Sequence, residues 1–352
     1  MKVTLVPGQE FSDDLVRVWM GLQQANPDLV SPYFHHEFTN VIAMVQNNVE
    51  VAVIESDGKI AAFFPFQRER RGIGGPVGGI ISDYHGLICA QDFRFSPSEL
   101  LKQSHLIAWK FDHLVTSQLS FAPFQRLVEP SPQINISDGY NAYVRERRLE
   151  GFQQLKKKIR RIEEKIGPLR FVADSVDVAA LEIVLAWKSL QYRETGNPDL
   201  FAPGWIREAM QRIFTTHADG CSGVLSLLYA GDRVVAGHFG MRSRRMWHYW
   251  FPSYDPEAVE YSPGLILLLK MAEHAPKIGV PVIDLGKGLS PYKERLMNSS
   301  FPLASGSVEL PSWRSFGHKT WKVLRTQMAA SSVGPLVRGA LEWTRKAANF
   351  DR

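Results

Sequence analysis

Two segments of the chain share one pattern of hydrophobic and polar positions. Residues 51–64, VAVIESDGKIAAFF, and residues 225–239, LSLLYAGDRVVAGHF, each contain an apolar run, an Asp and Gly pair, a basic residue and a second apolar run. Asp and Gly between apolar runs predict a β-hairpin, because a two-residue turn needs residues that tolerate a positive φ. The repeated pattern indicates an internal duplication, with chance similarity between two hairpins as the alternative.

Helical periodicity surrounds both hairpins. Apolar positions recur at helical spacing over residues 13–26 and 35–46 before the first hairpin, and over residues 176–192 before the second. After these, helices are predicted at 203–217 and 263–275, and a buried strand is predicted to end near Asp284. The pattern predicts an α/β (α+β) fold of two tandem domains, residues 1–150 and 151–310, each a mixed sheet flanked by helices.

The charge of the chain is concentrated at its end. Residues 311–352 contain eight Lys and Arg against two Asp and Glu, a net charge of +6, whereas the whole chain carries +5. A basic amphipathic helical tail is predicted there, and it either contacts an anionic membrane or packs on the body of the protein. Residues 155–167, LKKKIRRIEEKIG, predict a charged helix between the domains that either binds phosphate or a tRNA backbone, or simply exposes its charged face.

Composition excludes several classes of protein. With 352 residues, 45% of them hydrophobic and 22% charged, the chain is neither disordered nor fibrous. Cys89 and Cys221 match no metal or redox spacing, and no apolar run approaches the ~20 residues of a membrane helix. No signal peptide is recognised, so a cytoplasmic location is expected; peripheral contact at the inner membrane belongs to the alternative in which the tail binds lipid. Histidine spacing predicts no metal site.

The chemistry concentrates in residues 254–293. Ser262-Pro263-Gly264 opens a predicted helix, and a helix N-terminus is a natural site for a pyrophosphate. The next strand is followed by DLGKGLSPYK, which places an acid, two lysines and a phenol on glycine-rich backbone. These residues alone predict an anion-binding α/β enzyme.

This order of motifs resembles the GNAT-type acetyltransferase domain of the CelD/BcsL group, which is implicated in bacterial exopolysaccharide and cellulose biosynthesis. The matching features are the helix from Trp187 to Arg193, the hairpin through Ala236, Tyr254-Asp255-Pro256, Ser262-Pro263-Gly264, and Asp284-x-Gly286-x-Gly288 before Tyr292-Lys293. The usual GNAT pyrophosphate loop, Gln/Arg-x-x-Gly-x-Gly/Ala, is absent. The tandem arrangement also resembles the Fem-type aminoacyltransferases, whose Pro-x-x-x-Asp-Tyr-like acceptor element has a looser counterpart in residues 76–84, PVGGIISDY.

The resemblance implies direct acyl transfer from acetyl-CoA, or another acyl-CoA, to an amine or hydroxyl. It implies Asp83, Asp284 or His238 as the base and Tyr292 as the acid for the leaving thiolate, while a backbone N–H of an open strand meets the oxyanion. Binding of the co-substrate is expected from four further residues: Ser262, Gly264, Lys287 and Lys293.

Three functions are consistent with these motifs. The preferred interpretation is an acetyltransferase that acts on a sugar or sugar-nucleotide acceptor in surface polysaccharide synthesis. The first alternative is a Fem-like transferase in cell-wall synthesis that uses aminoacyl-tRNA, the only case in which nucleic acid is an expected partner. The second alternative is a non-catalytic scaffold of a polysaccharide complex.

Overall fold

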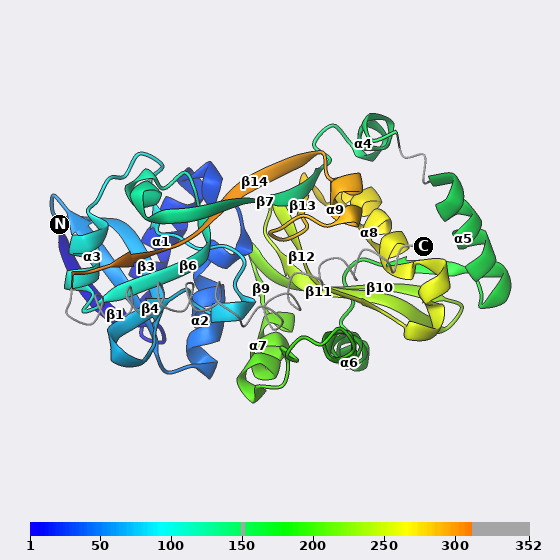
Figure 1. Ribbon diagram of the computed structural model, residues 1–352, viewed down its shortest axis with the longest axis horizontal. Helices are drawn as coiled ribbons and strands as arrows, with labels where there is room; N and C mark the ends of the chain where they lie inside the picture. Colours follow the sequence, from blue (N-terminus) through cyan, green and yellow to red (C-terminus); the bar gives the residue numbers. More distant parts are fainter. Residues whose placement is uncertain (149–151, 312–352) are drawn as a thin grey trace, which may run out of the picture.

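The strands of both halves of the chain form one sheet. The computed structural model describes residues 1–148 and 152–311, and in these residues 14 strands join in the order β1-β2-β3-β4-β6-β14-β7-β13-β12-β11-β10-β8, with β5 on β3 and β9 on β10. Helices cover the faces of this mixed sheet (Figure 1), which confirms the predicted fold class. The predicted helical tail lies outside the described residues.

The first half contains seven strands and four α-helices within residues 1–148. They are β1 (Lys2–Pro7), α1 (Asp13–Ala25), α2 (His36–Val45), β2 (Val49–Ser56), β3 (Lys59–Arg68), β4 (Ile73–Gly75), β5 (Ile88–Cys89), α3 (Pro97–Gln103), β6 (Ala108–Val115), β7 (Gln125–Asn135) and α4 (Tyr140–Glu146). The predicted hairpin is β2–β3, and both of its turn residues, Asp57 and Gly58, have positive φ.

The second half repeats the hairpin and adds the last strands of the sheet. Its elements within residues 152–311 are α5 (Phe152–Lys165), β8 (Leu169–Val172), α6 (Val178–Glu194), α7 (Gly204–Phe214), β9 (His217–Ala218), β10 (Cys221–Ala230), β11 (Arg233–Arg242), β12 (Met246–Tyr254), α8 (Pro263–His274), β13 (Val282–Asp284), α9 (Pro291–Leu296) and β14 (Ser299–Glu309). The second predicted hairpin is β10–β11. No helix in the described residues combines the length and apolar composition needed to span a membrane.

Strand β14 ties the two halves together. It comes from the range predicted for the second domain, yet it pairs antiparallel with both β6 and β7 of the first half. Strand β7 in turn pairs with β13. Figure 1 shows β7 and β14 running side by side between the halves. The sheet is therefore continuous across the predicted domain boundary.

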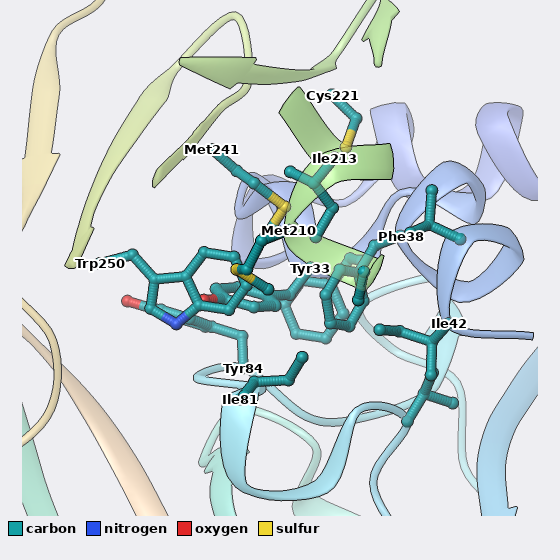
Figure 2. Close-up of a cluster of buried hydrophobic side chains, with 14 of the residues drawn as sticks. Tyr33, Phe38, Ile42, Ile81, Tyr84, Met210, Ile213, Cys221, Met241 and Trp250 are labelled. Carbon is teal, nitrogen blue, oxygen red and sulfur yellow. The ribbon is translucent and has the colours of Figure 1, made fainter. Parts of the chain in front are cut away.

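One hydrophobic core also spans both halves. It joins α1 and α2 to α6 and α7, and Figure 2 shows residues of both halves, such as Tyr33, Phe38, Met210 and Ile213, packed in one cluster. A second core lies between α8, α5 and the strands β10 to β13. Helices α6 and α8 therefore cover opposite faces of the second half of the sheet.

Strands β12 and β13 separate where the functional side chains gather. They pair in parallel from Met246↔Val282 to His248↔Asp284, and there the pairing ends. Strand β12 continues to Tyr254, whereas the chain leaves the sheet after Asp284 through a loop that contains Gly286 and Gly288, both with positive φ. The gap between these two strands opens a cleft.

Candidate active site

The cleft at the separated strands has a volume of about 220 Å³ and takes its walls from both halves of the chain. Asp83 and His113 come from the first half, and Lys188 comes from α6. Strand β12 contributes Tyr249, Trp250 and Pro252, and the segment after β13 contributes Leu285, Gly286, Lys287, Tyr292 and Lys293. A substrate bound there contacts both halves at once.

His248 lies between two carboxylates at the base of this cleft. Its Nε2 is 2.8 Å from Asp83 Oδ2, and its Nδ1 is 3.2 Å from Asp284 Oδ1. The side chains of His248 and Asp284 are fully buried, whereas that of Asp83 is 23% exposed. Asp83 is therefore the member of this unit that faces the cleft.

Asp284 is held by a set of hydrogen-bond donors. Its carboxylate accepts from Tyr84 Oη at 2.6 Å, from Ser131 Oγ at 2.9 Å and from Gln133 Nε2 at 3.1 Å. The backbone N–H of Gly286 donates to it at 2.9 Å. Burial raises the pKa of Asp284, but His248 and these donors outweigh burial and lower the pKa to about 2. Asp284 is thus an ionised anchor, and its full burial keeps it from reaching a molecule in the cleft.

The two carboxylates keep His248 protonated. Burial lowers the pKa of His248, but the contacts with Asp284 and Asp83 outweigh burial and raise the pKa to about 9. Burial likewise raises the pKa of Asp83, and the contacts with His248 and His113 overcome it and lower the pKa below its ordinary value. The unit as a whole carries one negative charge, which is directed into the cleft at Asp83.

His113 continues this network toward the surface. Its Nε2 is 3.7 Å from Asp83 Oδ1, and its Nδ1 is 3.0 Å from the exposed carboxylate of Asp112. His85, Asp112 and His113 also bring potential metal-ligand atoms within 4.8 Å of one another. Both nitrogens of His85 are already used, because Nδ1 accepts from the His113 backbone N–H and Nε2 contacts Ser82 O at 3.0 Å. These three residues fit a hydrogen-bonded cluster better than a metal centre.

The predicted lysines line the cleft, but their ammonium groups are engaged. Lys293 Nζ donates to the carbonyl oxygens of Gly286 at 2.8 Å and Gly288 at 3.2 Å, which closes the loop after β13. Lys287 Nζ is 3.4 Å from Glu129 and donates to Ser305 Oγ at 3.0 Å. Both lysines therefore stabilise the loop that shapes the cleft.

Tyr292 lines the same wall as the lysines. It is the second residue of α9, and burial raises the pKa of its phenol to about 12. The phenol is consequently protonated at neutral pH and can act as a proton donor in the cleft.

The N-terminus of α8 lies next to Tyr249. Pro263 is the first residue of the helix, as predicted, and Ser262 precedes it with a φ of 53°. Tyr249 Oη donates to Gly264 O at 3.4 Å, and Lys158 of α5 donates to Ser262 Oγ at 2.6 Å. The predicted co-substrate residues Ser262 and Gly264 thus stand beside a lysine and adjoin the cleft through Tyr249.

His238 is the predicted base that does not reach the cleft. It is fully buried on β11, its ring stacks on Tyr249 at 4.9 Å, and Trp250 N donates to its Nε2 at 3.2 Å. Burial lowers its pKa to about 3. The structure places Asp83, Asp284, Tyr292, Lys287 and Lys293 together, while His238 stands behind β12 and supports its backbone.

Sequence patterns missed three residues of the site. His248, His113 and Lys188 lie on two strands and a helix where they interrupt no motif, and only the pairing of β12 with β13 brings His248 opposite Asp284. A charged residue within an otherwise apolar strand, as in MWHYWF, was the one signal available for His248.

Residues 150–294 match the family model of the acetyltransferase (GNAT) domain. No curated protein matches the sequence significantly. Among solved structures, FemX superposes with a TM-score of 0.59 at 8% identity, covering 90% of this chain and 99% of that one. The C-terminal domain of a protein described as a lysylphosphatidylglycerol synthetase, from Agrobacterium fabrum, gives 0.51 at 13% identity, covering 87% and 97%. A conserved protein of unknown function from Bacteroides thetaiotaomicron gives 0.50 at 12% identity, covering 86% and 99%.

These structural similarities show a shared fold alone, because the identities are low. The family match covers residues 150–294, less than half of the chain, and indicates an acyltransferase domain of the GNAT type in that segment. It does not separate the CelD/BcsL group from other GNAT domains, so that part of the resemblance stays a prediction.

Proposed function

We propose that this GNAT-type acyltransferase moves an acyl group from acetyl-CoA to an amine or hydroxyl of an acceptor bound in the cleft, with Asp83 as the proton acceptor. The observation that carries the proposal is the Asp83–His248–Asp284 unit, which is negatively charged and exposed to the cleft only at Asp83. Ionisable groups that line a cleft, with pKa values shifted by burial and by charged partners, are typical of a catalytic site.

The transfer is a single displacement. The acceptor's nitrogen or oxygen attacks the thioester carbonyl carbon while its proton passes to Asp83, the C–S bond breaks, and the leaving thiolate takes a proton from Tyr292. Asp83 then loses its proton to solvent and the Tyr292 phenolate regains one. His248 holds Asp83 in place and keeps it ionised before each cycle. Proton transfer contributes roughly 10²–10⁴-fold, and orientation in a shared cleft contributes further.

The donor fits the side of the cleft that adjoins α8. A pyrophosphate at the N-terminus of this helix meets the positive end of the helix dipole, and Lys158 adds a positive charge next to Ser262. The acyl end then points between β12 and β13 toward Asp83. Ser262, Gly264 and Lys158 are the residues proposed to bind the donor, while Lys287 and Lys293 hold the loop behind the acyl group.

For the acceptor, a sugar or sugar nucleotide remains our preferred class, and surface polysaccharide synthesis the preferred process. The second candidate is a Fem-like transfer from aminoacyl-tRNA. It is favoured by one observation, the exposed basic residues Lys156, Lys157 and Arg160 on α5. Location in the cytoplasm and membrane contact through the tail remain part of the proposal.

Isothermal calorimetry with acetyl-CoA, combined with a thiol assay for released CoA, tests the proposed function. We expect binding that weakens in Lys158→Gln and persists in Lys165→Gln, which removes an exposed charge from the other end of α5. The absence of acetyl-CoA binding in folded protein would overturn the acetyl-CoA proposal. Salt-dependent binding of bulk tRNA in its place would favour the second candidate.

A further inference from the structure

Lys188 is a cation that the fold leaves without a carboxylate. It lies on α6 and lines the cleft. In residues 1–148 and 152–311 no Asp or Glu oxygen lies within 4.0 Å of its ammonium, whose contacts are Gln191 Oε1 at 3.5 Å and the face of the Tyr192 ring at 5.4 Å. A half-buried lysine with such weak partners stands ready to bind an anion.

The other two lysines of the cleft differ from Lys188 in this respect. Three loop carbonyls surround Lys293 Nζ, and Lys287 is paired with Glu129 and hydrogen-bonded to Ser305. Of the lysines that line the cleft, Lys188 therefore offers the ammonium that is most available to a ligand. Burial, together with the charge of Lys293, lowers its pKa to about 8, so the charged form prevails at neutral pH.

Lys188 and the proposed donor site lie on opposite faces of the sheet. Helix α6 packs in the core that spans both halves and accepts a hydrogen bond from Ser253 Oγ at Val184 O, whereas α8 packs in the second core. A donor whose phosphates lie at α8 approaches the acyl-transfer point from one face. The acceptor must approach from the side of α6, where Lys188, Trp250 and Pro252 form the wall.

Charges of opposite sign thus line the cleft. Asp83 presents a negative charge beside the transfer point, and Lys188 presents a positive charge on the wall formed by α6. A molecule that carries an attacking amine or hydroxyl together with an anionic group matches both charges at once.

We propose that Lys188 binds an anionic group of the acceptor, a phosphate or a carboxylate, and so selects acidic acceptors. This inference rests on the proposed function for the identity of the acceptor, but the anion site itself does not need acyl transfer. Lys188 acts in recognition, and Asp83 remains the proton acceptor.

Calorimetry of the full chain with two simple probes, inorganic phosphate and acetate, tests the anion site. We expect at least one probe to bind the wild type, and binding to weaken roughly tenfold or more in Lys188→Gln, because an ammonium–anion hydrogen bond is lost. Lys188→Arg keeps the charge and is expected to restore much of the binding. Lys59→Gln, at the exposed β2–β3 turn, is the matched control and is expected to bind like the wild type.

Comparison of the two probes identifies the source of the charge. Tighter binding of phosphate supports a phosphorylated acceptor, and tighter binding of acetate supports a carboxylic acid. The proposal is overturned if neither probe binds the wild type, or if Lys188→Gln binds both probes as the wild type does. Loss of phosphate binding in Lys158→Gln with full binding in Lys188→Gln would also overturn it, because the probe would then report the donor site.

Acetyl-CoA binding separates this inference from the proposed function. Lys188→Gln is expected to bind acetyl-CoA like the wild type while it loses the anionic probe. If the wild type binds the probe through Lys188 but does not bind acetyl-CoA, the anion site stands and the acetyl-CoA proposal fails. If acetyl-CoA binds and the anionic probe binds Lys188→Gln as tightly as the wild type, the acyltransferase proposal stands and the inference fails.

Discussion

At the scale of single residues, the burial of His248 between Asp83 and Asp284 governs how stability responds to pH. The pKa of His248 is raised from 6.5 to about 9, so its contribution is complete below pH 6.5 and is lost as the pH rises through 9. The pKa of Asp284 is lowered from 3.8 to about 2, so its contribution is complete above pH 3.8 and is lost as the pH falls through 2. The Asp83–His248–Asp284 unit therefore stabilises the fold most between pH 3.8 and pH 6.5.

We therefore expect the free energy of unfolding to fall between pH 6.5 and 9 by on the order of 1–3 kcal/mol more in the wild type than in His248→Gln. Glutamine removes the titrating group and keeps an N–H donor of similar size. Chemical denaturation at both pH values measures the difference. Equal pH dependence in the two proteins would show that folding does not raise the pKa of His248.

Asp83→Asn is expected to lower the rate of acyl transfer by roughly 10²–10⁴-fold while the protein stays folded. Asparagine keeps the shape of the side chain but cannot accept the acceptor's proton. The measurement is the rate of CoA release at saturating acetyl-CoA, with circular dichroism as a check of the fold.

Asp112→Asn is the matched control for this substitution. It removes a carboxylate that is 62% exposed and that pairs with His113 and His85, with no ion pair to His248. We expect only a small change in the rate of acyl transfer in Asp112→Asn. An equal loss in both variants would show that Asp83 acts through the negative electrostatic potential of the cleft and not as the proton acceptor.

Sequence patterns found the parts of the site at and just after the end of β13 and missed those within longer strands and helices. Asp284 ends β13, and Lys287, Tyr292 and Lys293 follow it, where charged and polar residues after an apolar run are conspicuous. His248 depends on the register of two strands that are joined through a helix, and single-sequence patterns carry no information about such pairing. His238 has a chemically attractive side chain, but its burial behind β12 was invisible in the sequence.

At the scale of elements, the loop after β13 sets the width of the cleft. A Cβ atom on Gly286 would lie 3.8 Å from Asp83 Oδ2 and 3.9 Å from Lys293 Nζ. We expect Gly286→Ala to reduce acyl transfer roughly tenfold or more, because the methyl group occupies the space between the proton acceptor and the loop. Steady-state kinetics with acetyl-CoA measures this loss.

Gly288→Ala separates filling of the cleft from backbone strain. Gly288 has a φ of +88°, comparable with +78° at Gly286, but a Cβ there would meet no atom within 4 Å. Both variants are expected to lose ~1–2 kcal/mol of stability, with the loss of activity confined to Gly286→Ala. Similar kinetics for the two variants would show that strain alone is responsible.

Local signals predicted the helices and hairpins well. Helix α1 begins after Ser12, whose hydroxyl accepts from Leu15 N, and α6 begins after Asp177, whose carboxylate accepts from Ala179 N. Such caps are encoded within a few residues. The location of β14 between β6 and β7 is a contact between distant segments, so no local pattern indicated it.

At the scale of the whole molecule, β14 makes the two halves depend on each other. If a protease site replaces residues 149–151 and is cleaved, we expect the halves to remain associated, because β14 pairs with β6 and β7, and β7 pairs with β13. Size-exclusion chromatography of the cleaved protein in native buffer measures this association. Separation of the halves without denaturant would contradict a continuous sheet.

Residues 1–148 expressed alone provide the complementary test. Without β14, the edges of β6 and β7 have no partner between them, and unpaired edges promote aggregation. We expect this fragment to be soluble only when it is co-expressed with residues 152–352. A stable, monomeric fragment would show that the first half folds independently.

The position of β14 near the end of the described chain also determines when the sheet can be completed during protein synthesis. Strand β6 ends at Val115, but its partner β14 ends at Glu309, so the ribosome must add many further residues before the sheet is complete. At ~5–20 residues per second, the edges of β6 and β7 that pair with β14 stay without a partner for roughly 10–40 s. A nascent chain of this protein is therefore most vulnerable to aggregation in the middle of its translation, and a chaperone that shields strand edges would act there.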